Sequence, residues 1–385
     1  MEDFPYLCTY ISFIMYDQIR EDTIYMMLYA VVTVMAALAS IYLLFRRGNA
    51  FAADVTTPRR LRRWTAAFFA VLALGHLWYL PVTMADSSEV VMLTMLIGVL
   101  LDCTLTIPLA FVVMLCMLQD RRRPLWPVVA MMMPLVVVVL VCMVTRSFAY
   151  SPWLRAYFLL TVLGFTIYMA CAVRQYGRWL RDNYADLEHK EVWQSFVVLA
   201  VIILLIGYYV VGYGDKAYEY IVQVYGLVLI GFLLWRVETL SDLSIVPSMP
   251  IAMEEETAPI EDMEEKVPSQ TSYDFIAPLL QQYCVDTKLY LQHDLSVVQL
   301  AKAIGTNRLY LSQYFSCQGT TYNAYINDLR IGHFVKLYRE AAADKRNVTA
   351  QQLANGCGYR SYSTFTLAFK QRMGQSVTAW MREMD

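Results

Sequence analysis

The ionisable residues with the clearest chemical capability lie inside apolar stretches of the sequence. His76 is near the middle of one such stretch, and Asp102 is in the middle of the next. Ionisable groups are costly to bury in lipid and often serve a function there. A histidine beside a carboxylate can titrate near neutral pH, so this pair could sense protons or a ligand. The alternative is that each residue makes an interhelical hydrogen bond that fixes packing.

The elements that carry these two residues are predicted to be membrane-spanning helices. The chain has 385 residues, of which 58% are hydrophobic and 17% are charged. Soluble domains have about 45–50% apolar and about 25% charged residues, so the composition argues against a single soluble enzyme and against a disordered chain. A helix needs about 20 apolar residues to cross a bilayer. The segments that reach this length are Ile24–Phe45, Trp64–Ala85, Val90–Leu118, Leu125–Thr145, Trp153–Val173, Val192–Tyr213 and Tyr218–Val237.

Basic residues alternate between the loops that join these seven segments. The loops after the first, third and fifth segments are rich in arginine. The stretch before the first segment and the loops after the second, fourth and sixth together hold only Arg20, Arg146 and Lys216. Cytoplasmic loops carry the excess of basic residues. The N-terminus is therefore predicted to lie outside an inner (cytoplasmic) membrane, with everything after residue 238 in the cytoplasm. The run Arg59–Arg63 fits this role, and the alternative for it is a nucleic-acid or anionic-lipid patch.

The chain lacks the sequence patterns of a metal site, a cofactor site or an enzyme. Its 8 cysteines are scattered and form no CxxC pair, which argues against a zinc site or a disulfide framework. It has no glycine-rich phosphate loop, nucleophile elbow or HExxH spacing. His189 beside Glu188 could be a phospho-acceptor, but no ATP-binding segment follows. We therefore expect no enzymatic activity, no metal and no cofactor.

Residues 239–272 are predicted to be an acidic linker. The segment contains several prolines and the run EEETAPIEDMEE, and it has no hydrophobic period. Such a composition is typical of a disordered tether. The predicted organisation is therefore a seven-span membrane domain over residues 1–238, a disordered linker over residues 239–272 and a basic soluble domain over residues 273–385.

Two stretches of the soluble domain have the pattern of a helix, a tight glycine turn and a second helix. In SVVQLAKAIG the apolar residues repeat at helical spacing up to Gly305, and NRLYLSQYF follows with Leu311 and Phe315 four residues apart. A long helix is predicted in TYNAYINDLRIGHFVKLYREAA, and the pattern then recurs around Gly358. Apolar residues at this spacing cover one face of a helix. We therefore expect two helix-turn-helix units joined by one long helix.

These stretches resemble the DNA-binding domain of AraC/XylS-type regulators over residues 288–382. The matching words are DLSVVQLAKAIG, YLSQYF, YINDLRI and LANGCGYRSYSTFTLAFKQRMGQS. The last word fits the family pattern A-x-x-x-G-[FY]-x-S … F … FK-x-x-x-G-x-S almost throughout. The sequence departs from the family at Phe334, Val377 and Met381, where a small residue, a proline and an arginine are usual.

The resemblance implies that the second helix of each unit enters the major groove, with the two insertions on one DNA face about a turn apart. The residues that it would present to the bases are Asn307, Arg308, Leu309, Ser312 and Gln313 in the first unit, and Tyr362, Ser363, Thr364 and Leu367 in the second. Arg308 and Gln313 have the donor geometry for guanine and adenine edges. Arg360, Lys370 and Arg372 are better placed for phosphates, and the alternative for these cations is an ordinary solvated helix face.

The expected fold is therefore all-α, with a seven-helix transmembrane bundle followed by a cytoplasmic domain of two helix-turn-helix units. The leading hypothesis is a membrane-tethered one-component transcription regulator, in which a signal sensed by the bundle passes through the last span and the linker. Expected partners are double-stranded promoter DNA, the lipid bilayer and RNA polymerase, with a homodimer and a membrane partner protein as further candidates. The alternative is a membrane receptor or transporter whose tail binds a protein partner rather than DNA.

Overall fold

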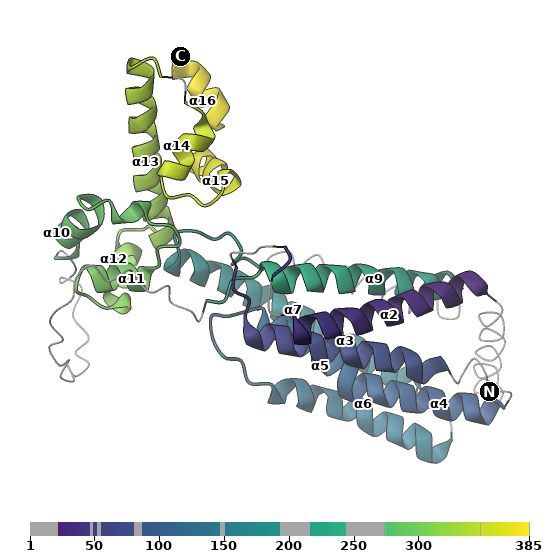
Figure 1. The fold of residues 1–385 in the computed structure, drawn as a ribbon. Coiled ribbons are helices and arrows are strands. Elements are labelled where there is room, and N and C mark those ends of the chain that lie inside the picture. The colour runs from purple at the N-terminus through teal and green to yellow at the C-terminus, as the bar shows by residue number, and fades with distance from the viewer. Residues whose placement is uncertain are drawn as a thin grey trace. The chain divides into compact units, whose positions relative to one another are not determined.

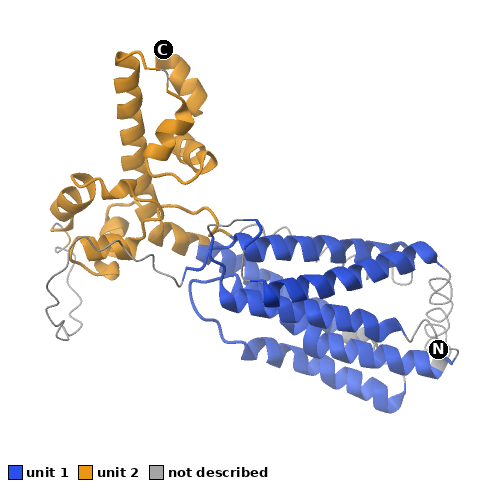
Figure 2. Ribbon diagram, viewed as in Figure 1, with its two compact units in different colours: residues 1–176, 192–246 blue, residues 177–191, 247–385 orange. Residues whose placement is uncertain are grey.

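The computed structural model describes residues 22–46, 49–51, 55–80, 87–146, 151–192, 216–243, 273, 275–346 and 348–384, and this part of the chain is helical. The chain divides into two compact units (Figure 2). The first consists of residues 1–176 and 192–246, and the second of residues 177–191 and 247–385. The second unit therefore includes a short segment that is remote from the rest of it in sequence.

The first unit is a bundle of long apolar helices (Figure 1). Its helices are α2 (Thr23–Phe45), α3 (Arg59–Tyr79), α4 (Ser88–Leu101), the π-helix η2 (Asp102–Thr106), α5 (Ile107–Cys116), α6 (Trp126–Thr145), most of α7 (Ser151–Asn183) and α9 (Lys216–Thr239). Helix α2 packs along α3 and α9, and α4 packs along α6. The helices α4, η2 and α5 follow one another without a break and form one apolar segment.

Five helices in the described part of the chain are long and apolar enough to cross a membrane. They are Thr23–Phe45, Glu89–Cys116, Trp126–Thr145, Ala156–Asn183 and Glu219–Thr239. Large apolar side chains point away from the bundle on these helices, among them Ile24 (70% exposed), Val144 (84%) and Val228 (63%). Water disfavours so much apolar surface, whereas a bilayer accommodates it. These helices therefore support membrane association of the first unit.

The other two predicted spans differ from these five. Helix α3 forms where the second span was expected, but arginines fill its first turns and lower its mean hydropathy. One of them, Arg62, donates from Nε to the carbonyl of Leu43 at 2.7 Å and so ties α3 to the end of α2. Residues 193–215, which hold nearly all of the sixth predicted span, lie outside the described residues, as do residues 244–272 of the predicted linker. The count of seven spans stays a prediction.

The second unit contains two pairs of short helices connected by one long helix, α13 (Tyr322–Ala343). The first pair is α11 (Val297–Ala303) and α12 (Arg308–Cys317), and the second is α14 (Ala350–Gly356) and α15 (Tyr362–Met373). The elements that complete the two halves are α10 (Ile276–Leu280), the π-helix η3 (Gln281–Val285) and the 3₁₀ helix η4 (Leu289–Leu291) before α11, and α16 (Val377–Met384) after α15. Each pair has a hydrophobic core of its own.

The three departures from the AraC/XylS pattern are packing residues of the second core. Phe334 is fully buried, and its ring centroid lies 4.6 Å from that of Phe365. Val377 begins α16 and is buried, while Met381 packs against the edge of the same core. These departures therefore lie in the second core and not on the exposed faces of α12 and α15.

One buried cation joins the two helix pairs. Arg330 on α13 is 0% exposed, and it donates from Nε to the carbonyl of Tyr290 and from a terminal nitrogen to that of Gln292, both at 2.7 Å. Its guanidinium also lies 5.4 Å from the ring centroid of Tyr359. Tyr290 and Gln292 precede the first pair, whereas Tyr359 lies in the turn of the second. Arg330 therefore fixes both pairs to one point of α13 through charge-assisted hydrogen bonds and a cation–π contact.

Replacing Arg330 by methionine should separate the two pairs. Arg330→Met removes both hydrogen bonds and takes their donor from the carbonyls of Tyr290 and Gln292, so we expect a loss of about 3 kcal/mol in the stability of this unit. Arg339→Met changes an exposed arginine on the same helix and should shift stability by less than about 0.5 kcal/mol. Hydrogen–deuterium exchange of the amides of α14 and α15 in the full chain measures the loss of stability in each of the two variants. Equal protection in the two variants would contradict the role given to Arg330.

Candidate nucleic-acid interface

Local hydrogen bonds determine where the helices of the first pair begin and end. Ser296 Oγ accepts from the Gln299 amide at 3.3 Å, and Gln299 Oε1 accepts from the Ser296 amide at 2.8 Å. This reciprocal pair is a capping box, which starts α11. Gly305 then adopts φ +73°, a left-handed conformation that ends the helix at little steric cost. Asn307 caps α12 by accepting from the Tyr310 amide at 2.9 Å.

The second pair repeats this local plan. Thr349 and Gln352 form the capping box of α14, and Ser361 caps α15 by accepting from the Thr364 amide at 3.3 Å. Gly358 has φ +84°, and a Cβ atom added to it would lie 2.6 Å from the Leu291 carbonyl oxygen. The turn of the second pair therefore packs directly against the backbone just before the first pair, and only glycine permits that approach.

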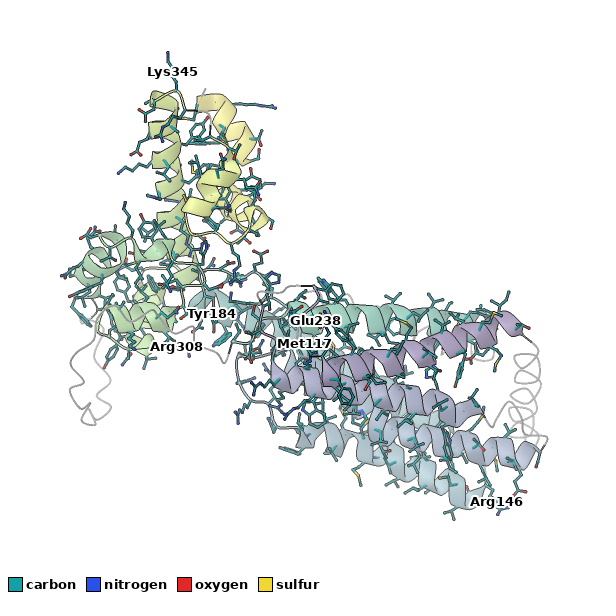
Figure 3. All side chains as sticks on the ribbon, viewed as in Figure 1. Met117, Arg146, Tyr184, Glu238, Arg308 and Lys345 are labelled. Carbon is teal, nitrogen blue, oxygen red and sulfur yellow. The ribbon has the colours of Figure 1, made fainter. Side chains whose placement is uncertain are left out.

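On helix α12, most of the residues that are predicted to contact bases are exposed to solvent. Asn307, Arg308, Leu309 and Gln313 are exposed, whereas Ser312 is half-buried. Figure 3 labels Arg308 on α12. Leu309 is 62% exposed, which places an apolar side chain among polar ones. Gln313 Oε1 accepts a hydrogen bond from the Tyr273 hydroxyl at 2.5 Å. Leu311 and Phe315, by contrast, are buried in the first core, as their spacing predicted.

Helix α15 presents a narrower face. Ser363, Leu367 and Lys370 are exposed at a spacing of four and three residues, so they share one side of the helix. Leu367 is 61% exposed. Tyr362 and Thr364 are half-buried: the Tyr362 ring lies against Phe365, and Thr364 Oγ1 donates to Glu188 Oε2 at 3.1 Å. Of these five residues, the structure therefore places Ser363, Leu367 and Lys370 on one exposed face. Tyr362 and Thr364 instead contact neighbouring protein residues.

Two of the three cations predicted to contact phosphates form ion pairs within the unit. A terminal nitrogen of Arg360 lies 2.9 Å from Asp294 Oδ2, and Arg372 Nε lies 2.9 Å from Asp328 Oδ1. Asp294 Oδ1 is also 2.8 Å from Lys190 Nζ. Burial raises the pKa of Asp294, but its two cationic partners outweigh that effect, so the pKa lies below its usual value. Asp294 is therefore a carboxylate at neutral pH and holds both cations.

Sequence reasoning missed Arg330, Asp294 and the segment that contains Glu188 and Lys190. For Arg330 a signal was available, because Ile326, Arg330 and Phe334 are spaced four residues apart on one face of α13. All three are 0% exposed. A lone cation on an apolar stripe indicates a buried charge with specific partners. The contacts of residues 184–190 have no comparable sequence signal.

The predicted sensing residues lie in the first unit, and each contacts a different helix. His76 Nε2 on α3 lies 3.3 Å from Gln223 Oε1 on α9. Asp102 Oδ2 accepts from the Tyr79 hydroxyl at 3.0 Å, which joins η2 to α3. A Cβ atom on Gly98 would lie 2.4 Å from the Tyr79 ring, so this glycine makes room for the contact. Asp102 also opens the π-helix, a turn type frequently found at functional sites.

In the described part of the chain, no group of three or more His, Cys, Asp or Glu residues could hold a metal ion. Comparison with known families matches residues 300–383 to a helix-turn-helix domain family. Comparison with curated proteins and with solved structures gives no match. The matched range runs from within α11 through α16, and so it contains both glycine turns and both α12 and α15. Residues 300–383 of this chain are an AraC-type helix-turn-helix domain, preceded by several apolar helices.

Proposed function

We propose that this chain is a membrane-tethered transcription regulator that binds specific DNA through α12 and α15 and responds to a signal sensed by its membrane helices. The observation that carries the proposal is the pair of exposed helix faces held to one long helix by Arg330. A helix that presents polar side chains in this way fits the major groove. Two such helices on one rigid support would read two successive turns of one DNA face.

The exposed side chains suit different parts of the DNA. The guanidinium of Arg308 would donate to guanine O6 and N7, and the Gln313 amide would pair with adenine. The exposed Leu309 and Leu367 would contact thymine methyl groups. Lys370 would contact phosphates, as would Arg360 and Arg372 once they leave Asp294 and Asp328. Direct base contacts would supply specificity, and the cations would supply salt-dependent affinity.

The apolar helices would keep this domain at the inner membrane, with its DNA-binding face in the cytoplasm. The alternation of basic loops supports this orientation. Control of transcription would require contact with RNA polymerase, and two copies confined to one membrane would pair more readily because their effective concentration is raised. A signal could act on the bundle directly or through a membrane partner protein.

Loss of two base-contacting side chains should abolish sequence preference. We would first recover duplexes from a random-sequence pool with the full chain in lipid nanodiscs. We expect Arg308→Ala with Gln313→Ala to weaken binding of the recovered duplex at least tenfold, because each good contact discriminates by about 1–3 kcal/mol. Binding to unrelated duplexes should change much less. Fluorescence anisotropy at two salt concentrations measures both affinities.

The matched control is Lys345→Ala, which removes one exposed charge just beyond the end of α13 (Figure 3). It should bind the recovered duplex as the wild-type chain does. Weak binding that is equal on all duplexes and unchanged in the double variant would contradict the proposal. That outcome would favour a membrane receptor or transporter whose tail binds a protein partner.

The contacts of His76 and Asp102 in the bundle support a role in sensing. His76 and Asp102 each bond a residue of another helix, and a protonatable residue in such a contact can couple its charge state to packing. If target expression responds to external pH, His76→Ala or Asp102→Asn should abolish that response at unchanged protein level. Thr166→Val is the control, because the Thr166 hydroxyl bonds only within its own helix, to the Val162 carbonyl at 2.8 Å. A pH response preserved in both variants would rule out this pair as the sensor.

A further inference from the structure

A short segment that follows α7 is built into the core of the DNA-binding unit. The Ala185 amide donates to the Leu295 carbonyl at 3.1 Å, and Tyr184 pairs with Ser296 in an antiparallel bridge. Ala185 is 2% exposed and lies in the same hydrophobic core as Leu300. Figure 3 labels Tyr184 at the start of this segment. We refer to residues 184–190 as the clasp segment.

Side-chain contacts hold the clasp segment to the first half of the unit. Asn323 on α13 donates from Nδ2 to the carbonyls of Ala185 at 2.6 Å and Tyr184 at 3.2 Å. Lys190 Nζ lies 2.8 Å from Asp294 Oδ1, with 6% of the Lys190 side chain exposed. A largely buried ion pair and amide-to-carbonyl bonds are specific contacts that a loosely tethered loop would not make.

The clasp segment also reaches the second helix pair. Thr364 Oγ1 donates to Glu188 Oε2 at 3.1 Å, and the Glu188 amide in turn donates to Asp186 Oδ1 at 3.0 Å. Asp294, which holds Lys190, also pairs with Arg360 at 2.9 Å. The clasp segment therefore contacts both helix pairs of the unit, and the Glu188 side chain lies at the first turn of α15.

This docked position conflicts with DNA binding. Thr364 lies in the first turn of α15, and the start of the second helix is the part that helix-turn-helix proteins direct at base edges. The Glu188 carboxylate adds a negative charge at that end and occupies the Thr364 hydroxyl. DNA would bring phosphates to the same place, and like charges facing each other disfavour association.

The clasp segment is joined directly to an apolar helix. Helix α7 runs unbroken from Ser151 to Asn183, and the segment begins at the next residue. Residues 156–183 of this helix are long and apolar enough to cross a membrane. A helix transmits displacement along its axis, so a shift of α7 in the bilayer would move Tyr184 with it.

We propose that the clasp segment competes with DNA for the start of α15, and that movement of α7 withdraws it. When it is docked, Glu188 opposes the approach of DNA, and when it is withdrawn, the Thr364 hydroxyl becomes available to the duplex. This inference rests on the DNA-binding function proposed above. It assigns signal transfer to α7 rather than to the last span and the acidic linker.

The test combines hydrogen–deuterium exchange with affinity measurements on the full chain in lipid nanodiscs, with the recovered duplex as the probe. The amides of residues 184–190 should be protected without DNA and should lose protection at saturating duplex. Because coupling between sites is reciprocal, Glu188→Gln should bind the duplex roughly fivefold or more tightly than wild type. Glu340→Gln removes one exposed carboxylate of α13 and should bind as wild type does.

Three results would overturn the proposal. Exchange of the 184–190 amides at the unfolded rate without DNA would show that the segment is not docked. If the 184–190 amides keep their protection when a duplex binds, and Glu188→Gln binds that duplex with wild-type affinity, the segment does not compete with DNA. That result would leave the proposed DNA-binding function intact. Failure of wild type and Glu188→Gln to bind any duplex above a non-specific level would remove both proposals, even if the amides are protected.

Discussion

The buried guanidinium of Arg330 is the interaction on which the geometry of the second unit depends. Two helix pairs with separate cores could in principle sit at any angle on a long helix. Arg330 removes that freedom, because it bonds the backbone before α11 and contacts Tyr359 in the turn before α15. The close approach of Gly358 to Leu291 adds a steric constraint at the same place. Together they hold α12 and α15 as one DNA-reading surface in the function we propose.

The local parts of this unit could be predicted from the sequence because their signals are short-range. A cap, a left-handed glycine and apolar residues four apart specify each helix pair, and Gly305 and Gly358 occupy the expected turns. Burial of Leu311 and Phe365 followed from the same spacing. The exposure of Gln313 followed too, since it falls on the face of α12 opposite Leu311 and Phe315. Arg308, by contrast, shares the side of Leu311 and is exposed because it is the first residue of the helix.

Other features could not be predicted because they join residues far apart in the chain. Nothing in the sequence around Ala185 indicates that its amide donates a hydrogen bond to the Leu295 carbonyl. Likewise, nothing around Glu188 indicates that its carboxylate accepts one from the Thr364 hydroxyl. Domain boundaries drawn from composition follow hydropathy and therefore place residues 177–191 with the helices before them, whereas in the structure these residues belong to the second compact unit. In the bundle, likewise, the apolar pattern located His76 and Asp102 but not Gln223 and Tyr79, their hydrogen-bond partners.

The most direct test of the central claim is a hydroxyl-radical footprint of the full chain on a duplex that it selects. Two helices fixed to one support should protect two patches on one face of the DNA, separated by about one helical turn. Arg330→Met, which frees the two pairs from each other, should blur or lose one patch while the other persists. A single patch in the wild-type chain, or a footprint that Arg330→Met leaves unchanged, would contradict a rigid two-helix reading surface.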